Sequence, residues 1–168
     1  MKMNRFMWLT MAAAVLCGGC FFSRGVPAKS VNYLPGLPEK SEPLLSLRPG
    51  AVSNISGAGK EFLLRGEANT VKVVPEMRWL NSPESMLKSV MLMTFAGDHR
   101  APAVSAQIVR FEFTPDFREL EAVIIFSIKA EKNIVCVETV PVKDENYGEA
   151  ASQLFKRVIN KVSTAVKK

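Results

Sequence analysis

Between Tyr147 and Val166, apolar residues recur at intervals of three and four positions. This spacing places them along one face of an α-helix, with polar residues on the opposite face. Acidic residues precede the segment and basic residues lie along its second half, as the dipole of a helix favours. The pattern predicts a long amphipathic helix that lies across a sheet. Its apolar positions are Ala150, Ala151, Leu154, Phe155, Val158, Ile159, Val162 and Ala165.

A second helix is predicted from a cap signal near the middle of the chain. Asn81 or Ser82 can cap a first turn, and Pro83 suits the first helical position. The helix is expected to run to about Phe95, before a Gly-Asp-His-Arg turn ends it. One of its faces is apolar and should be buried. The residues expected on that buried face are Leu87, Val90, Met91 and Thr94.

Short apolar or alternating runs predict strands outside these helices, because Gly, Pro, Asn and Ser bound them. Gly66–Asn69 separates two of the runs and indicates a hairpin. Residues 51–59 are rich in Ser, Gly and Asn, so we expect a loop there. The predicted strands are Val31–Leu34, Leu44–Leu47, Glu61–Arg65, Thr70–Val74, Val104–Phe113, Leu120–Ile128 and Asn133–Val142.

The last three strands should form an antiparallel meander, because short turns link them. Val104–Phe113 alternates between apolar and polar residues and should have one wet face. Leu120–Ile128 has apolar residues on both faces, so we expect a central strand that is covered on both sides or lies at a subunit contact. In Val104–Phe113 the apolar face would carry Val109, Phe111 and Phe113, and the wet face Arg110 and Glu112.

These elements predict a single α+β domain, a mainly antiparallel β-sheet packed against two α-helices. The chain has 168 residues, which is too short for two domains of ordinary size once a targeting segment is removed. Its 48% hydrophobic and 23% charged residues are typical of a globular protein. We expect the domain to span residues 31–168 and residues 20–30 to form a tether.

The N-terminus has the layout of a secretory signal peptide at residues 1–19. Met1 to Arg5 is short and basic, Phe6 to Leu16 is apolar except for Thr10, and Cys17-Gly18-Gly19-Cys20 follows. The last residues resemble the lipid-attachment motif of bacterial lipoproteins. The resemblance implies that Cys20 becomes the mature N-terminus and carries a diacylglyceryl group and a fatty acyl chain such as palmitate.

Two other readings of this N-terminus stay open. The apolar run from Phe6 to Phe22 approaches the ~17-residue lower limit for an uncleaved membrane anchor, although Gly18-Gly19 interrupts it. The second alternative is an ordinary secreted protein whose signal peptide is cleaved after Ala14 or Gly19. In the lipoprotein reading only Cys136 remains free, and its apolar surroundings predict a buried, unreactive thiol.

The charge of the chain argues against a nucleic-acid partner. The formal net charge is +6, and Lys2 and Arg5 belong to the targeting segment, so the mature part is only mildly basic. The bases of the last helix suit its C-terminal dipole, and no aromatic residues interleave with them as they do in nucleic-acid patches. Those bases are Lys156, Arg157, Lys161, Lys167 and Lys168.

No catalytic residues, metal ligands or cofactor site are predicted. His99 is the only histidine and has no His, Cys or Glu at ligand spacing. Gly57-Ala58-Gly59-Lys60 lacks the spacing and the Ser or Thr of a phosphate-binding loop. Glu119 and Glu121 lie on the same face of a predicted strand, and we interpret them as solvated residues of a strand edge rather than as a catalytic pair of carboxylates. A binding or structural protein is therefore favoured over an enzyme.

Taken in order, these elements resemble the ABC-type transport auxiliary lipoproteins, which include the paraquat-inducible C-type lipoproteins. The resemblance covers nearly all of the mature chain. It rests on the segment at Cys20, Tyr33-Leu34, Phe62-Leu63-Leu64-Arg65, Arg78-Trp79 before the helix Pro83–Phe95, Val109-Arg110-Phe111-Glu112 and the helix Tyr147–Val166.

The resemblance implies a non-catalytic periplasmic accessory of a lipid-carrying ABC system. Its implied partners are a membrane, held through the lipid anchor, a Mce-domain protein and ABC transporter subunits, with assembly into a homo-oligomer. Phe21 follows Cys20 where aspartate would signal retention in the inner membrane of enterobacteria, so the expected location is the periplasmic face of the outer membrane. A generic envelope-assembly lipoprotein and a hydrolase with an unrecognised site stay open as alternatives.

Arg78 and Trp79 have two interpretations. In the structural one, Trp79 packs under the following helix and Arg78 pairs with a carboxylate to hold the turn. In the functional one they form a partner-binding hot spot, because Arg and Trp are enriched in such sites.

Overall fold

The computed structural model describes residues 46–129 and 132–166. The predicted signal peptide, Cys20, the tether and the predicted strand Val31–Leu34 lie outside the described residues. Among the residues described, no helix is long and apolar enough to cross a membrane. The helices and strands are, in chain order, β1 (Arg48–Asn54), β2 (Glu61–Arg65), the short 3-10 helix η2 (Glu67–Asn69), β3 (Val71–Arg78), α2 (Pro83–Thr94), β4 (Ala103–Phe113), β5 (Glu119–Ile128), β6 (Lys132–Pro141) and α3 (Tyr147–Val166).

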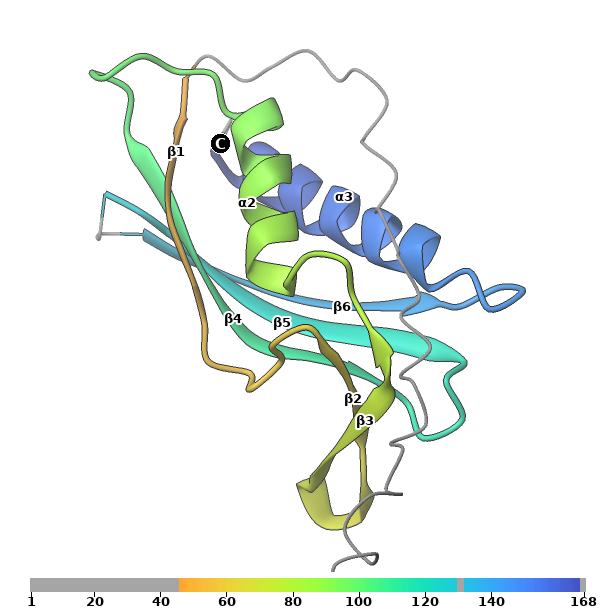
Figure 1. Cartoon of the computed structure of the whole chain (residues 1–168). Coiled ribbons are helices and arrows are strands. Elements are labelled where there is room, and N and C mark those ends of the chain that lie inside the picture. Colours follow the sequence, from red (N-terminus) through yellow and green to blue (C-terminus); the bar gives the residue numbers. More distant parts are fainter. Residues whose placement is uncertain (1–45, 130–131, 167–168) are drawn as a thin grey trace, which may run out of the picture.

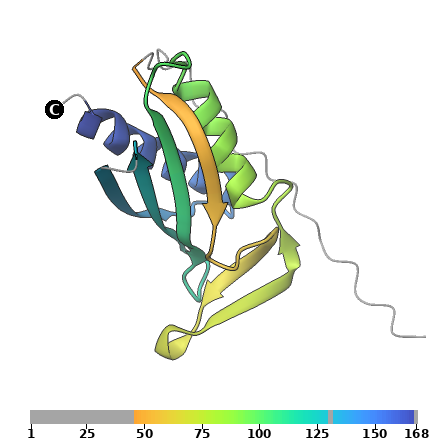
Figure 2. The ribbon, with the colours of Figure 1, turned by 90° about the vertical axis from the view of Figure 1, so that its left-hand side faces the viewer.

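Strand β4 lies at the centre of a mixed six-stranded sheet. One of its edges pairs antiparallel with β5, and β5 pairs in the same way with β6. On its other edge β1 runs parallel to the first half of β4, and β2 meets its last residue. The β2–β3 hairpin projects beyond the other strands (Figures 1 and 2). The predicted α+β domain, hairpin and meander are thereby confirmed.

Both predicted helices are present and lie on the same side of the sheet (Figures 1 and 2). Helix α2 begins after Ser82, whose hydroxyl oxygen accepts a hydrogen bond from the Ser85 amide at 3.3 Å. All four residues expected on its buried face are buried. Helix α3 lies across β5 and β6 and buries every predicted apolar position up to Val162.

The core fills the space between the helices and the sheet. Side chains of β4 and β5 alternate into it, and an aromatic cluster occupies the end next to the β2–β3 hairpin. Stacked and edge-to-face contacts of this kind add to the stability that apolar burial provides. The rings in mutual contact are Phe62, Trp79, Phe111, Phe113, Phe117, Tyr147 and Phe155.

The loop predicted over residues 51–59 is wrong in its first four residues, because β1 continues to Asn54. Of the predicted strand Leu44–Leu47, the described Ser46 and Leu47 precede β1 rather than belonging to it. Residues 48–54 have a poor intrinsic preference for a strand, and they form β1 because they pair with β4. A Cβ at Gly50 would lie 2.8 Å from the Val104 carbonyl oxygen, so glycine permits this close approach.

The predicted alternation of β4 is wrong at Val109, because the strand contains a β-bulge there. The pairing register with β5 shifts between Ile108 and Arg110, which leaves Val109 as the extra residue. Before the bulge the even-numbered side chains are buried, and after it Phe111 and Phe113 face the core. The bulge thus lets both halves of a long strand present apolar residues to the helices.

Candidate functional site

The candidate site is the face of the sheet opposite α2 and α3, which we call the open face. Within residues 46–129 and 132–166, helices cover only the other face. Cross-strand pairing aligns the side chains of β4, β5 and β6 on the open face into rows. These rows are Ser105, Ser127 and Asn133; Gln107, Ile125 and Val135; Arg110, Val123 and Val137; and Glu112, Glu121 and Thr139.

The two middle rows contain an apolar block formed by Val123, Ile125, Val135 and Val137. Val135 and Val137 expose 60% and 61% of their surface, and the two β5 residues are half-buried between their neighbours. Isolated exposed valines need no explanation, but four adjacent apolar side chains on one face form a contiguous patch. Strand β5, predicted to be apolar on both faces, therefore lies inside the sheet, with helices over one face and this patch on the other.

An ion cluster borders the apolar block at the end next to the β2–β3 hairpin. Arg65 Nε donates to Glu112 Oε1 at 2.8 Å, and the same guanidinium also pairs with Glu121. Arg110 Nε lies 3.5 Å from Glu112 Oε1. The hydrogen bond to Glu112 is the main cause that raises the pKa of Arg65 above its usual value. Two cations thus neutralise two carboxylates on the open face.

Arg65→Met is expected to destabilise the domain by about 1–2 kcal/mol, because Glu112 would lose its closest partner. The Glu112 side chain is only 7% exposed, whereas that of Arg65 is 30% exposed, so solvent reduces the effect. Urea denaturation followed by circular dichroism measures the change. Glu112→Gln added to Arg65→Met should recover part of the loss, since it removes the unpaired charge.

Arg110→Met serves as the matched control for that prediction. Its contact with Glu112 is longer and its side chain is 42% exposed, so a smaller loss is expected. Equal losses for the two arginine variants, or a loss below about 0.5 kcal/mol for Arg65→Met, would contradict a cluster held chiefly by Arg65.

The free edge of β6 is covered by side chains of α3. Arg157 Nη1 donates to the Thr139 carbonyl oxygen at 3.1 Å, and Lys161 Nζ donates to that of Val137 at 3.4 Å. Lys161 also pairs with Glu138, which is buried beneath α3. Cations that occupy edge carbonyls hinder the addition of a further strand. Growth of the sheet at β6 is therefore disfavoured.

The two predicted partner-binding residues lie in different environments. Trp79 is 2% exposed and packs against Phe62, with ring centroids 4.3 Å apart. The Arg78 side chain is 50% exposed, and its Nη2 donates to Glu61 Oε1 at 2.9 Å across the hairpin. The indole belongs to the core, and Arg78 is the member of the pair that a partner could touch.

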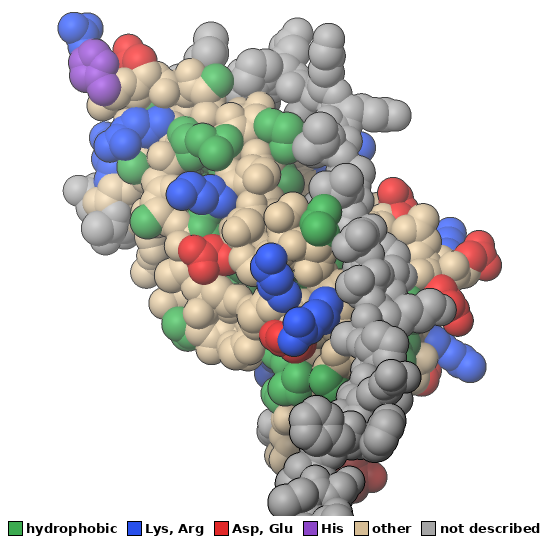
Figure 3. Space-filling view, in the orientation of Figure 1, with side chains coloured by type: hydrophobic (Ala, Val, Ile, Leu, Met, Phe, Trp, Pro, Cys, Tyr) green, Lys and Arg blue, Asp and Glu red, His purple; other side chains and the backbone are tan. Residues whose placement is uncertain are grey.

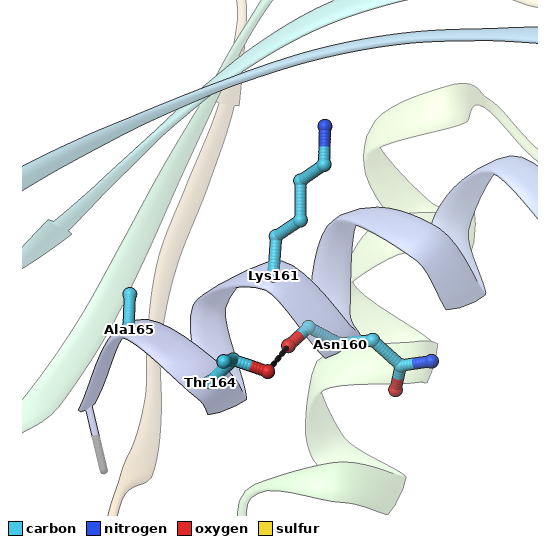
Figure 4. A pocket seen from close by; sticks show the side chains of 4 residues that line it. All are labelled: Asn160, Lys161, Thr164 and Ala165. Carbon is cyan, nitrogen blue, oxygen red and sulfur yellow. Dashed lines mark hydrogen bonds between the residues drawn. The ribbon is translucent and has the colours of Figure 1, made fainter. Parts of the chain in front are cut away.

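On the face that carries α2 and the edge strand β1 in the view of Figure 1, hydrophobic side chains form small separate patches among charged ones (Figure 3). A shallow hollow of about 410 Å³ lies at the C-terminal half of α3, and its lining residues within the described part of the chain come from this helix. Thr164 donates to the Asn160 carbonyl oxygen at 2.9 Å, and Lys161 extends away from both (Figure 4). These polar groups do not converge on a common point.

His99 lies in the exposed turn between α2 and β4, as predicted for a surface residue. Cys136 is buried, its Sγ lies 3.9 Å from the Val158 carbonyl oxygen, and burial raises the pKa of its thiol. In the part of the chain that the structure describes, no three His, Cys, Asp or Glu side chains gather as metal ligands would. The only described cysteine is thus a core residue.

Sequence reasoning identified Arg110 and Glu112 on one strand face but did not connect Arg65 with them. Arg65 ends β2, and its two carboxylate partners lie 47 and 56 residues further along the chain. The sequence does show that Arg65 ends an apolar strand and that Glu112 and Glu121 lie on later strands. Their contact could be predicted only by knowing that β2 meets the end of β4.

Comparisons with known proteins bear on the fold alone. The sequence matches no protein-family model, and no curated protein matches it. The fold is similar to a crystal structure described as an uncharacterized protein, with a TM-score of 0.56 and 9% identity over 82% of this chain and 97% of that one. Protein XCC0632 from Xanthomonas campestris, described with the family DUF330, is also similar, with a TM-score of 0.49 and 14% identity over 82% and 90% of the two chains. The first structure supports the single α+β domain.

Proposed function

We propose that this protein is an envelope lipoprotein, anchored through Cys20, that serves as a non-catalytic auxiliary of a Mce-associated ABC-type lipid transport system. Its folded domain would stand on the periplasmic face of the outer membrane, joined to the lipid by the tether of residues 20–30. The observation that carries the proposal is the combination of a lipid-attachment sequence with an open sheet face.

The open face supports a docking role because of its composition. Apolar side chains occupy its middle, and the charges beside them are already paired. Contiguous exposed apolar patches rimmed by polar groups are typical of surfaces that bind another protein. The order of the elements resembles that of transport auxiliary lipoproteins, which makes a transporter component the favoured partner.

Cys20→Ala is expected to abolish lipid attachment, because no other thiol is placed to become the mature N-terminus. The variant should accumulate as an unlipidated soluble form or an uncleaved precursor. Mass spectrometry of the N-terminal peptide, with density-gradient separation of the membranes, measures both processing and location. An unmodified Cys20 in the wild-type membrane fraction would contradict the proposed lipid anchor. Co-migration of the wild type with inner-membrane markers would contradict the proposed location at the outer membrane.

Crosslinking in the native envelope, followed by purification of the full chain, tests the transport role. A Mce-domain protein or ABC transporter subunit should be recovered with the wild type and with Leu92→Lys, which adds a charge to an exposed residue of α2. Cys20→Ala should lose that partner. Recovery of neither class of protein from envelopes that contain the crosslinked wild type would overturn the proposal.

A further inference from the structure

A small hollow on the open face lies beside the β-bulge of β4, between that strand and the β2–β3 hairpin. It has a volume of about 120 Å³. Pockets that enclose whole small molecules usually measure about 300–1,000 Å³, so this hollow has room for a single functional group carried by a larger body. The described residues that line it are Ser56, Arg65, Val71, Val109, Arg110 and Glu112.

The bulge places Arg110 in this hollow. Ile108 is buried before the bulge, so continued alternation would turn residue 110 toward the helices. The extra residue Val109 reverses the alternation, and Arg110 therefore joins Glu112 on the open face. Bulges are common next to functional sites, where they redirect a side chain.

Arg110 has a free hydrogen-bonding end, unlike Arg65, whose guanidinium holds two carboxylates. Arg110 approaches Glu112 only through Nε, at 3.5 Å. In the part of the chain that the structure describes, its Nη1 and Nη2 donate to no acceptor, and its side chain is 42% exposed. The Ser56 hydroxyl already donates to Asn54 Oδ1 at 2.7 Å. The donors that the hollow offers to an outside group are therefore those of Arg110.

A free guanidinium selects a carboxylate or a phosphate, because its planar fork donates two parallel hydrogen bonds to either group. The charge and size of the hollow favour the carboxylate. Glu112 and Glu121 already balance the two arginines and repel a doubly charged phosphate more strongly, and a lipid headgroup carries bulky groups on both sides of its phosphate. Arg65 bridges two carboxylates on this face, and Arg110 can bridge Glu112 and an added carboxylate in the same way.

Apolar side chains surround the hollow. Val123 is the cross-strand neighbour of Arg110, and Val137 follows in the same row. On the hairpin side, Val71 lines the hollow and is 49% exposed. An arginine among apolar residues is typical of the centre of a protein interface, where it serves as an anchor. The carboxylate that fits here is therefore one carried by an apolar protein surface.

We propose that the hollow receives the carboxylate of an aspartate or glutamate side chain from the protein that docks on the open face, with Arg110 as the anchoring residue. The valines beside the hollow contact the apolar residues that flank this acidic side chain. The identity of the docking protein as a transporter component rests on the proposed function, whereas the acidic side chain and its place do not.

Carbodiimide crosslinking in the native envelope tests this proposal with the full, anchored chain. The reagent activates a carboxylate, a neighbouring amine attacks the activated carbon to form an amide bond, and the carbodiimide takes up the elements of water and leaves as a urea. Arg110→Lys supplies the amine in the hollow, and Glu112→Gln in the same chain removes the nearest internal carboxylate. Gln107→Lys with the same Glu112→Gln is the matched control, because residue 107 lies on the same strand and face beyond the bulge. Circular dichroism should show both variants folded.

Mass spectrometry of the crosslinked peptides is expected to show an amide bond between position 110 and an aspartate or glutamate of a second protein, about tenfold more abundant than at position 107. Exchanging that acidic residue for lysine should weaken recovery of the second protein by the wild type at least about tenfold, and Arg110→Glu should restore it. Failure of this charge exchange would overturn the proposal.

Two further results would also overturn it. If an amine-reactive ester labels the Arg110→Lys amine, and that amine forms no amide bond or bonds only to Glu121 of its own chain, the hollow is empty. If the amine is neither labelled nor linked, the hollow holds another occupant, such as a lipid phosphate or residues 21–45.

The identity of the linked protein separates this proposal from the proposed function. A linked protein outside the transport system that passes the charge exchange would support the acidic anchor and contradict the transport role. Recovery of a transporter subunit by an amine-to-amine crosslinker, without linkage at position 110, would support the transport role and overturn the acidic anchor.

Discussion

Ile124→Lys is expected to unfold the domain, whereas Ile125→Lys is expected to leave it folded. Ile124 is fully buried on the helix side of β5 and pairs with Ile108 and Cys136 on the neighbouring strands. Burying an unpaired ammonium group costs several kcal/mol, which is comparable to the total stability of about 5–15 kcal/mol for a domain. Ile125 faces the open side, so its lysine variant can keep the charge in water.

Circular dichroism and thermal denaturation of the two variants separate these outcomes. Ile125→Lys should lose at most about 1 kcal/mol, the usual range for a partly exposed strand position. Leu120→Lys, at another fully buried position of β5, should behave like Ile124→Lys. Unfolding of Ile125→Lys as well would mean that its face is covered in the folded monomer, and the open face would then be no interface.

Trp79→Ala is expected to cost about 3–5 kcal/mol of folding free energy, the usual loss for a large buried aromatic residue. The indole contacts Phe62, Phe111 and Phe113, so its removal opens a cavity between the hairpin and β4. Arg78→Ala should cost below about 1 kcal/mol, because its ion pair with Glu61 is largely exposed. Urea denaturation of both variants measures the difference.

The same pair of variants bears on the partner-binding prediction for these residues. If Arg78 contacts a partner, Arg78→Ala should weaken partner recovery from the envelope while leaving the melting temperature nearly unchanged. Trp79→Phe, which keeps an aromatic ring in the core, should retain most of the stability that Trp79→Ala loses. A loss below about 1 kcal/mol for Trp79→Ala would show that the cluster does not depend on the indole.

Local signals predicted the helices and most of the strands. Ser82 and Pro83 mark the start of α2, and the spacing of apolar residues defines α3, because both signals act within a few residues of the chain. The three strands of the meander were predictable for the same reason, since alternation and short turns are local. Their antiparallel order then follows from the lengths of the turns.

Non-local pairing decided what those signals could not. Residues 48–54 have little intrinsic preference for a strand, and they form β1 because β4 pairs with them about fifty residues later. The bulge at Val109 follows from fitting β4 to its neighbours, and it changes which side chains face the core. Both features depend on residues far away in the chain.

Some features of the candidate site could likewise be predicted from local sequence, and others depend on the tertiary structure. By itself the sequence determined that residues 120–128 are apolar on both faces, because composition and alternation are local signals, and the attachment of a lipid at Cys20 stays a prediction from a resemblance in residues 16–20. Only the tertiary structure decided that α2 and α3 lie on one side of the sheet, which leaves Ile125 rather than Ile124 on the open face. It also brought Arg65 to Glu112 and Glu121, since the contacts of a strand end depend on its place in the sheet and not on its neighbours in sequence.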